Sequence, residues 1–172
     1  QYDVHKDGLK VYTTINYQMQ KNAEEAVKEH FKYLQNEFFK HTKGYKDAPF
    51  TGISRADIDK YYMQAMKNSD RYRQLKEEGM SDKEIRANFD EKTKMRVFTW
   101  NGDKDTVMSP WDSLRYYKHF LNTGMVSIEP QTGHIKVYVG GINYKHFKFD
   151  NAKLGRRQVG STFKPFVYAS AM

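Results

Sequence analysis

Apolar residues in the first half of the chain recur mostly at every third or fourth position, as on one face of a helix. The clearest case runs from Tyr17 to His41, and Gly44 is a stop signal just beyond it. The apolar positions of this predicted helix are Met19, Ala23, Ala26, Val27, Phe31, Leu34 and Phe38. Ahead of the helix, residues Leu9–Ile15 ("LKVYTTI") are rich in β-branched and aromatic side chains and predict a strand.

The same half of the chain predicts two further helices. One covers residues 55–78 and ends at Gly79, and a shorter one continues to Phe89. Ser81 and Glu84 have the spacing of a capping box at the start of the shorter helix. Most positions on these helices are polar, which is typical of an insertion or a linking lobe, and we interpret their tyrosines and methionines as packing residues.

After Lys94 the pattern alternates as in strands. "MRVFTW" and "DTVM" flank the turn signal "NGDK" and predict a hairpin, and "MVSIEP" and "HIKVYVGG" flank "QTG" and predict a second one. Ser109 and Pro110 predict the start of a helix through Leu121, and a last helix is predicted from Ser161. The expected fold class is α+β, with antiparallel strands and helices packed on a sheet.

The composition fits a globular domain and excludes several kinds of site. Of 172 residues, 38% are hydrophobic and 15% aromatic, and no apolar run is long enough for a membrane span. The chain begins with Gln1 and has no signal-like core, so we expect it to be part of a longer protein. It has no cysteine, which excludes disulfides and thiolate catalysis, and its six histidines lack metal-ligand spacing. No metal and no cofactor are therefore predicted.

The net charge of +8 is concentrated near the end of the chain. Residues 113–172 carry nine basic and two acidic side chains, whereas residues 1–112 are nearly balanced. One interpretation is a solvated basic face, and another is a field that attracts anionic substrates to the last helix. A nucleic-acid partner is disfavoured, because the lysines are scattered and no nucleic-acid signature is present.

The last helix places Ser161 three residues before Lys164 in the run "GRRQVGSTFKPFVYASAM". A serine hydroxyl is a poor nucleophile until a base takes its proton, and Lys164 is the base nearest in sequence. Arg156, Arg157 and the helix dipole would favour a neutral amine that can accept this proton. The alternative is that Ser161 caps the helix and Lys164 lies on the surface, since a chain of this composition contains roughly one Ser-x-x-Lys by chance.

Three blocks of the sequence resemble the class A penicillin-binding proteins. "RRQVGSTFKPFVYASAM" is similar to the active-serine segment of penicillin-binding transpeptidases, although Val159 stands where that family usually has proline. "TGMVSIEPQTGHIKVYVGG" resembles the strand pair before that segment. "GLKVYTTIN" with "MQKNAEEAV" is similar to the lead-in to the transpeptidase domain of the bifunctional members. The blocks cover residues 8–30 and 124–172 in the order of the family.

This resemblance implies a partial serine-transpeptidase (β-lactamase-like) fold with a helical insertion. Residues 1–16 would be the lead-in strand, residues 17–94 the insertion or linking lobe, and residues 95–172 the N-terminal part of the transpeptidase domain. The family's Ser-x-Asn and Lys-Thr-Gly motifs do not occur in these 172 residues. We therefore expect them in a longer parent protein, and we expect this segment alone to be inactive.

The resemblance also implies a peptidoglycan D,D-transpeptidase. Ser161 would attack the bond between two terminal D-alanines of a stem peptide, with Lys164 as general base and the Ser161 N–H as an oxyanion donor. β-Lactams would acylate the same serine. The parent protein would carry a glycosyltransferase domain and a membrane anchor on the periplasmic face of the bacterial inner membrane, with cell-wall synthesis proteins as partners. The alternative is a non-catalytic envelope scaffold with a transpeptidase-like fold.

Overall fold

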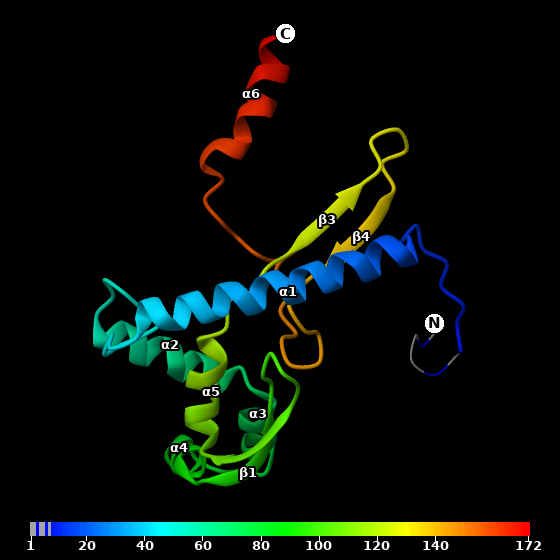
Figure 1. Ribbon diagram of the computed structural model, residues 1–172. Coiled ribbons are helices and arrows are strands. Elements are labelled where there is room, and N and C mark those ends of the chain that lie inside the picture. The colour runs from blue at the N-terminus through cyan, green and yellow to red at the C-terminus, as the bar shows by residue number, and fades with distance from the viewer. Residues whose placement is uncertain (1–2, 4–5, 7) are drawn as a thin grey trace. The chain divides into compact units, whose positions relative to one another are not determined.

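The computed structural model describes residues 3, 6 and 8–172, which form two compact units. One unit contains residues 24–122, and the other contains the described residues up to 23 together with residues 123–172. The division falls within the long first helix, α1 (Tyr17–Thr42), which confirms the predicted helix (Figure 1). Each unit combines helices with one antiparallel strand pair, so the α+β class is confirmed. No helix among the described residues is both long and apolar enough to cross a membrane.

The unit of residues 24–122 is built around one apolar core. After α1 its elements are α2 (Arg55–Lys67), α3 (Asp70–Glu77), α4 (Asp82–Asp90), β1 (Thr93–Val97), β2 (Lys104–Met108) and α5 (Pro110–Lys118). The core residues lie at helical spacing on α2, α4 and α5, so each helix turns one apolar face inward. They are Ile58, Tyr62, Met66, Ile85, Phe89 and Trp111.

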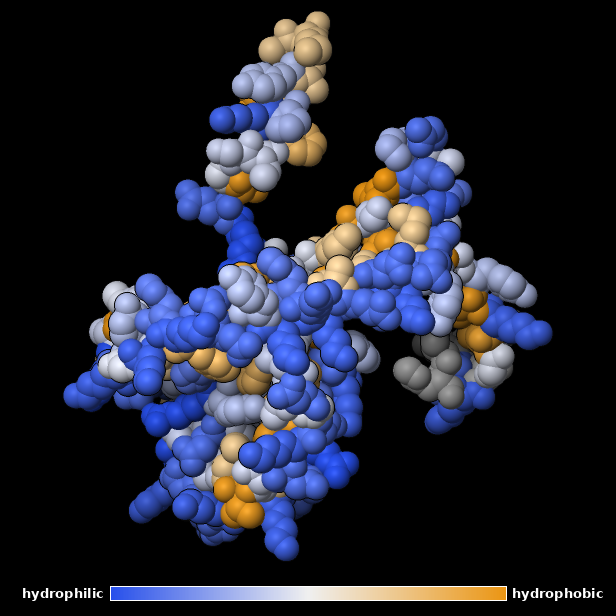
Figure 2. Space-filling model, viewed as in Figure 1, coloured by the Kyte–Doolittle hydropathy of each residue, from blue (hydrophilic) through white to orange (hydrophobic). Residues whose placement is uncertain are grey.

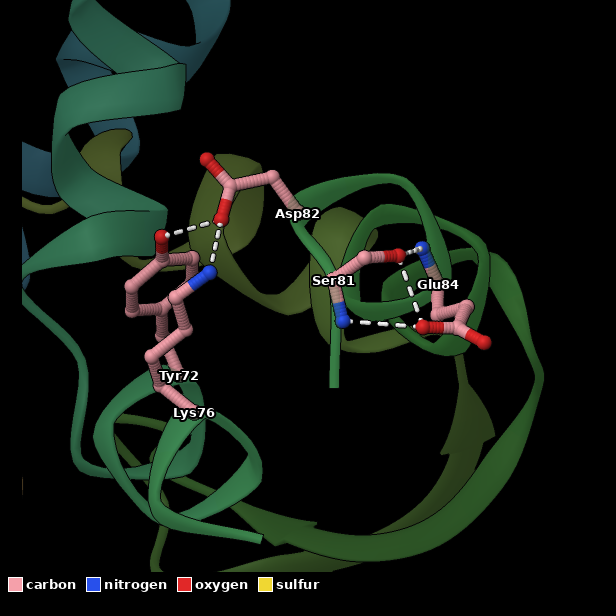
Figure 3. Close-up of polar contacts among 5 residues, drawn as sticks. All are labelled: Tyr72, Lys76, Ser81, Asp82 and Glu84. Atoms are coloured by element: carbon pink, nitrogen blue, oxygen red, sulfur yellow. Dashed lines mark hydrogen bonds and ion pairs between the residues drawn. The ribbon is translucent and has the colours of Figure 1, made fainter. Parts of the chain in front are cut away.

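A serine caps each of the helices α2 to α5. The caps are Ser54, Ser69, Ser81 and Ser109, and each hydroxyl accepts the backbone N–H of the residue three positions on. The predicted capping box of Ser81 and Glu84 is confirmed (Figure 3). The single helix predicted over residues 55–78 is wrong, because Asn68 ends α2 and Ser69 starts α3.

The first hairpin forms as predicted, but its first strand begins at Thr93 and ends at Val97, earlier than the predicted strand over residues 95–100. β1 and β2 pair antiparallel from Thr93 opposite Met108 to Val97 opposite Lys104. The strand was expected to reach Trp100. It ends at Val97 because two tyrosines of α5 take the backbone of Phe98: its N–H donates to the Tyr117 hydroxyl at 3.1 Å, and its carbonyl accepts from the Tyr116 hydroxyl at 2.6 Å.

The other unit contains the second predicted hairpin and the last helix. Its elements are β3 (Met125–Ile128), β4 (Ile135–Val139), the 3₁₀ turn η1 (Gly160–Phe163) and α6 (Lys164–Ala171). β3 and β4 pair antiparallel, which confirms the hairpin. Apolar side chains of β3 and β4 are exposed at Met125, Val126, Ile128 and Ile135 (Figure 2).

The strand predicted over Leu9–Ile15 does not form, and residues 1, 2, 4, 5 and 7 of the predicted lead-in segment 1–16 lie outside the described residues. Only the end of the segment contacts β4. The Thr14 hydroxyl donates to the Ile135 carbonyl at 2.7 Å, and the Asn16 N–H donates to the Lys136 carbonyl at 2.9 Å. A single backbone bond is too little to make a ladder, although the β-branched sequence favours one.

Two glutamines of α1 bind backbone in both directions, one in each unit. Gln35 is fully buried, donates to the His119 carbonyl at 2.8 Å and accepts the Leu121 N–H at 2.8 Å. Gln20 donates to the Tyr138 carbonyl at 3.0 Å and accepts the Tyr138 N–H at 2.8 Å. Each amide thus satisfies main-chain groups that would otherwise lack a partner.

Candidate active site

The predicted nucleophile and base lie one turn apart in the last helical segment. Ser161 belongs to η1 and Lys164 is the first residue of α6, with the Lys164 N–H bonded to the Ser161 carbonyl. Both residues are exposed, as is every residue from Lys153 to Met172. Among the described residues no hydrogen bond joins the two side chains. Ser161 and Lys164 are thus close along the chain, but their side chains do not bond to each other.

Ser161 does not cap this helix, so the capping interpretation is wrong. The residue at the cap position is Val159, and no side chain makes a cap bond there. The Val159 carbonyl instead accepts the Ser161 N–H at 2.8 Å, the Thr162 N–H at 3.3 Å and the Thr162 hydroxyl at 3.0 Å. Gly160 has φ +54°, which glycine adopts easily and other residues rarely do, and this tight turn starts η1.

The turn also affects the expected oxyanion donor. The Ser161 N–H points at the Val159 carbonyl at 2.8 Å, so in this structure it is already bonded. An oxyanion hole needs a donor aimed at the position where negative charge develops. The N–H expected to serve as a donor is therefore not presented to a substrate in this arrangement.

The charges around Ser161 are all positive. Lys153, Arg156, Arg157 and Lys164 lie in the last 22 residues, which contain no acidic side chain. The start of α6 has no acidic residue in its first turn to offset its helix dipole. Side chains and dipole therefore both favour a negatively charged group near the hydroxyl.

The loop before this segment is tied to the second hairpin by Asp150. Its carboxylate accepts the Tyr138 hydroxyl at 2.6 Å and the N–H groups of Ala152 and Lys153 at 3.0 Å each. The bond from Tyr138 and these N–H groups lower the pKa of Asp150, and the same hydroxyl bond raises the pKa of Tyr138. The carboxylate thus fixes the end of the loop on β4.

Backbone contacts complete this attachment. The Asn151 N–H donates to the Gly140 carbonyl at 2.7 Å, and the Asn151 side-chain amide donates to the same carbonyl at 3.1 Å. A Cβ at Gly124 would lie 2.4 Å from the Ala152 nitrogen, so glycine is required where the loop passes. The chain is therefore held up to Ala152, and the exposed serine segment follows directly.

The comparisons with known proteins agree on one family. Residues 45–121 match the penicillin-binding protein middle domain. Penicillin-binding protein 1A of Neisseria flavescens is 27% identical over 99% of this chain, and that of Aquifex aeolicus is 28% identical over 98%. Over nearly its whole length the chain is thus similar to penicillin-binding proteins 1A. A shorter stretch, 30% of the chain, is 46% identical to penicillin-binding protein 1A of Escherichia coli K12.

The chain spans about a quarter of the two relatives that it matches from end to end, 24% of the Neisseria protein and 23% of the Aquifex protein. The shorter match covers 6% of the Escherichia coli protein. No solved structure is significantly similar to this chain. The matched middle domain lies within the compact unit of residues 24–122. The division into residues 1–16, 17–94 and 95–172 stays a prediction.

The residues that hold the candidate site were not found from the sequence. Asp150 and Asn151 are residue types that favour local turns, and that signal predicts the loop. Their bonds to Tyr138 and Gly140 cross 11 or 12 residues of chain, and Gln20 reaches Tyr138 across 118. Such contacts depend on the tertiary fold, so no spacing in the sequence indicates them.

Proposed function

We propose that the protein containing this chain is a penicillin-binding protein of peptidoglycan synthesis, and that it cross-links stem peptides as a serine D,D-transpeptidase. The observation that carries the proposal is the state of Ser161. Its hydroxyl is exposed and caps no helix, whereas the serines that start α2, α3, α4 and α5 are all engaged in cap bonds. Lys164 stands one turn away, where it can serve as the base.

The proposed reaction uses the two side chains in sequence. Lys164 takes the proton from the Ser161 hydroxyl as the oxygen attacks the carbonyl carbon between two terminal D-alanines. The C–N bond breaks, the last D-alanine leaves with the proton, and an ester joins the stem to Ser161. An amine of a neighbouring stem then attacks the ester, a new amide forms, and the proton returns to Ser161.

Positive charge around the serine suits this substrate. The stem ends in a carboxylate, and Arg156, Arg157 and Lys153 surround the segment without acidic neighbours. The Ser161 N–H would have to leave the Val159 carbonyl to act as an oxyanion donor, so substrate binding would have to reshape η1. β-Lactams would acylate the same oxygen and remain attached.

The setting of the parent protein follows from the same proposal. It would carry a glycosyltransferase domain and a membrane anchor outside this chain, act on the periplasmic face of the inner membrane, and work with other cell-wall synthesis proteins. The family's Ser-x-Asn and Lys-Thr-Gly motifs would also lie outside this chain. The 172 residues alone are expected to form no stable penicillin adduct.

The test is intact-protein mass spectrometry of the full-length protein after incubation with benzylpenicillin. Ser161→Ala should form no adduct, and the matched control Ser170→Ala, in the following helix α6, should form one like the wild type. Lys164→Arg keeps a long basic side chain but stays protonated and cannot act as a base, so it should slow acylation by a factor of about 10²–10⁴. An adduct that persists in Ser161→Ala would identify another nucleophile. No adduct on the folded wild type would favour the non-catalytic scaffold.

A further inference from the structure

A pocket of about 480 Å³ lies within the unit of residues 24–122. Its walls come from the loop of residues 45–48, from the first turns of α2 and from the last turn of α5. The volume falls within the range of about 300–1,000 Å³ that is usual for small-molecule sites. It contains neither Ser161 nor Lys164, and nothing in the proposed transpeptidase reaction uses it.

The floor of the pocket belongs to the apolar core. Ile58 and Tyr62 line it and are only 8% and 3% exposed. The Tyr62 ring lies 6.0 Å from the Trp111 ring, which packs α2 against α5. Because core packing fixes these walls, the pocket exists without a ligand to shape it.

Three basic and two acidic side chains line the pocket, and only two of the five form an ion pair with each other. The Arg55 Nε lies 3.2 Å from the Asp47 carboxylate. Within residues 8–172 neither Lys46 nor Arg115 forms an ion pair, and the Asp59 carboxylate has no hydrogen-bond or ion-pair partner. Two cations and one carboxylate therefore remain to meet a ligand.

Arg115 is held in place although it has no acidic partner. Its guanidinium lies over the Tyr62 ring at 5.6 Å and over the Trp111 ring at 5.9 Å. Stacking leaves the edge of a guanidinium free, and that edge binds carboxylates through two parallel N–H bonds. Arg115 is thus a positioned donor at the wall of the pocket.

His119 adds one more polar group. Its Nδ1 lies 2.8 Å from the Arg115 carbonyl, which can only accept, so Nδ1 carries a proton. In the neutral ring, Nε2 is then an acceptor. The lining therefore offers donors from Lys46 and Arg115 together with acceptors from Asp59 and His119.

We propose that this pocket binds a short peptide with a free carboxylate and a free amine. The carboxylate would bind Lys46 and Arg115, the amine would bind Asp59, and apolar parts of the peptide would cover Ile58 and Tyr62. A phosphate or another multiply charged anion fits less well, because Asp59 would oppose it. The cationic and anionic side chains of the walls match a zwitterion that carries one negative charge at one end and one positive charge at the other.

The probe is tri-alanine with free ends, measured by ligand-observed NMR on the full-length protein. Every sample contains either the Ser161→Ala variant or wild-type protein treated with benzylpenicillin, so that the result does not depend on turnover at the proposed active site. N-acetylated tri-alanine, tri-alanine amide and inorganic phosphate are the comparison ligands. Free tri-alanine should bind tightest, and blocking either end should weaken its binding.

Substitutions in the pocket test separately the side chains proposed to bind the carboxylate end and the amine end of tri-alanine. Lys46→Gln and Arg115→Gln should each weaken binding at least tenfold, and Asp59→Asn should remove the difference between free and acetylated tri-alanine. Lys118→Gln removes a charge from the same helix outside the pocket and should leave binding unchanged. Lys46 is exposed and forms no ion pair within residues 8–172, so its variant remains a fair test if Arg115→Gln unfolds.

Three results would overturn the proposal: no binding of tri-alanine, equal binding by Lys46→Gln and Lys118→Gln, or tighter binding of phosphate than of tri-alanine. The penicillin adduct is a separate measurement on the same protein. Loss of the adduct with retained tri-alanine binding would remove the proposed function alone. Loss of tri-alanine binding with a retained adduct would remove the proposed pocket alone.

Discussion

Serines lie at or near the first residues of helical segments in both compact units, but their hydroxyls are used differently. In the unit of residues 24–122 the hydroxyls of Ser54, Ser81 and Ser109 accept the N–H three residues on and donate to the carboxylate of that same residue. The carboxylates belong to Asp57, Glu84 and Asp112. In the other unit the residue three positions after Ser161 is Lys164, and no cap bond forms.

The residue at the third position decides whether the hydroxyl also meets a carboxylate; Ser69, with the uncharged Tyr72 there, still caps α3 and donates to the Met66 carbonyl. A carboxylate there suits the helix dipole and holds the hydroxyl in two bonds. Lysine offers the hydroxyl no carboxylate oxygen, and Ser161 lies inside η1 and not at its cap position, so its hydroxyl makes no cap bond. The same spacing thus serves folding in one unit, while in the other it leaves a group available for chemistry.

The two units also differ in how they bury their helices, and substitution of phenylalanine makes the difference measurable. Phe89 is 2% exposed and Phe166 is 67% exposed. Phe89→Ala should lower the free energy of unfolding of the 172-residue chain by about 3–5 kcal/mol, because it leaves a cavity. Phe166→Ala should change it by no more than about 0.5 kcal/mol. Urea titration measures both, and equal losses would contradict the contrast.

Gln35 and Gln20 of α1, which each bind backbone groups, give a second comparison of stability between the units. Gln35→Ala should cost about 2–4 kcal/mol, because it leaves the His119 carbonyl and the Leu121 N–H without their buried partner. Gln20 is only partly buried, and water can reach its backbone partners, so Gln20→Ala should cost about 1 kcal/mol. A larger loss for Gln20→Ala in the same titration would reverse this ranking.

Acid should weaken the link between α3 and α4 (Figure 3). Asp82 accepts Lys76 at 2.6 Å and the Tyr72 hydroxyl at 3.0 Å, and these two bonds lower its pKa below the ordinary 3.8. Its contribution to stability is therefore present above about pH 4 and is lost as the pH falls through the lowered pKa.

Unfolding curves between pH 2 and pH 7 measure this loss. Asp82→Asn should flatten the dependence of stability on pH at its acid end. Asp59→Asn is the control, since Asp59 has no described hydrogen bond or ion pair, and it should leave the dependence as in the unsubstituted chain. An unchanged slope in Asp82→Asn would show that its bonds contribute nothing to stability.

The sequence predicts the elements whose causes are local. The spacing over Tyr17–His41, the Ser81–Glu84 box and the turn at Asn101–Lys104 each specify their element from neighbouring residues alone. The strand expected over Leu9–Ile15 and the extension of β1 to Trp100 fail because distant groups decide them. Tyrosines of α5 take the Phe98 backbone, and β4 offers one backbone bond to Asn16.

The candidate site divides in the same way. That Ser161 and Lys164 share a turn follows from their spacing, and the structure has them in consecutive elements. Their catalytic roles remain predictions. The bond from the Ser161 N–H to Val159 and the attachment of the loop through Asp150 depend on the fold and were not predictable from the sequence.

The central claim is that the Ser161 hydroxyl is free for chemistry and does not serve the helix. The most direct test compares Ser161→Ala with Ser109→Ala, measuring the unfolding free energy of the 172-residue chain and the benzylpenicillin adduct of the full-length protein. Ser109→Ala should lose about 1 kcal/mol and keep the adduct, while Ser161→Ala should change stability by less than about 0.5 kcal/mol and lose the adduct. A stable adduct on Ser161→Ala, or a loss of stability equal to that of Ser109→Ala, would contradict the account.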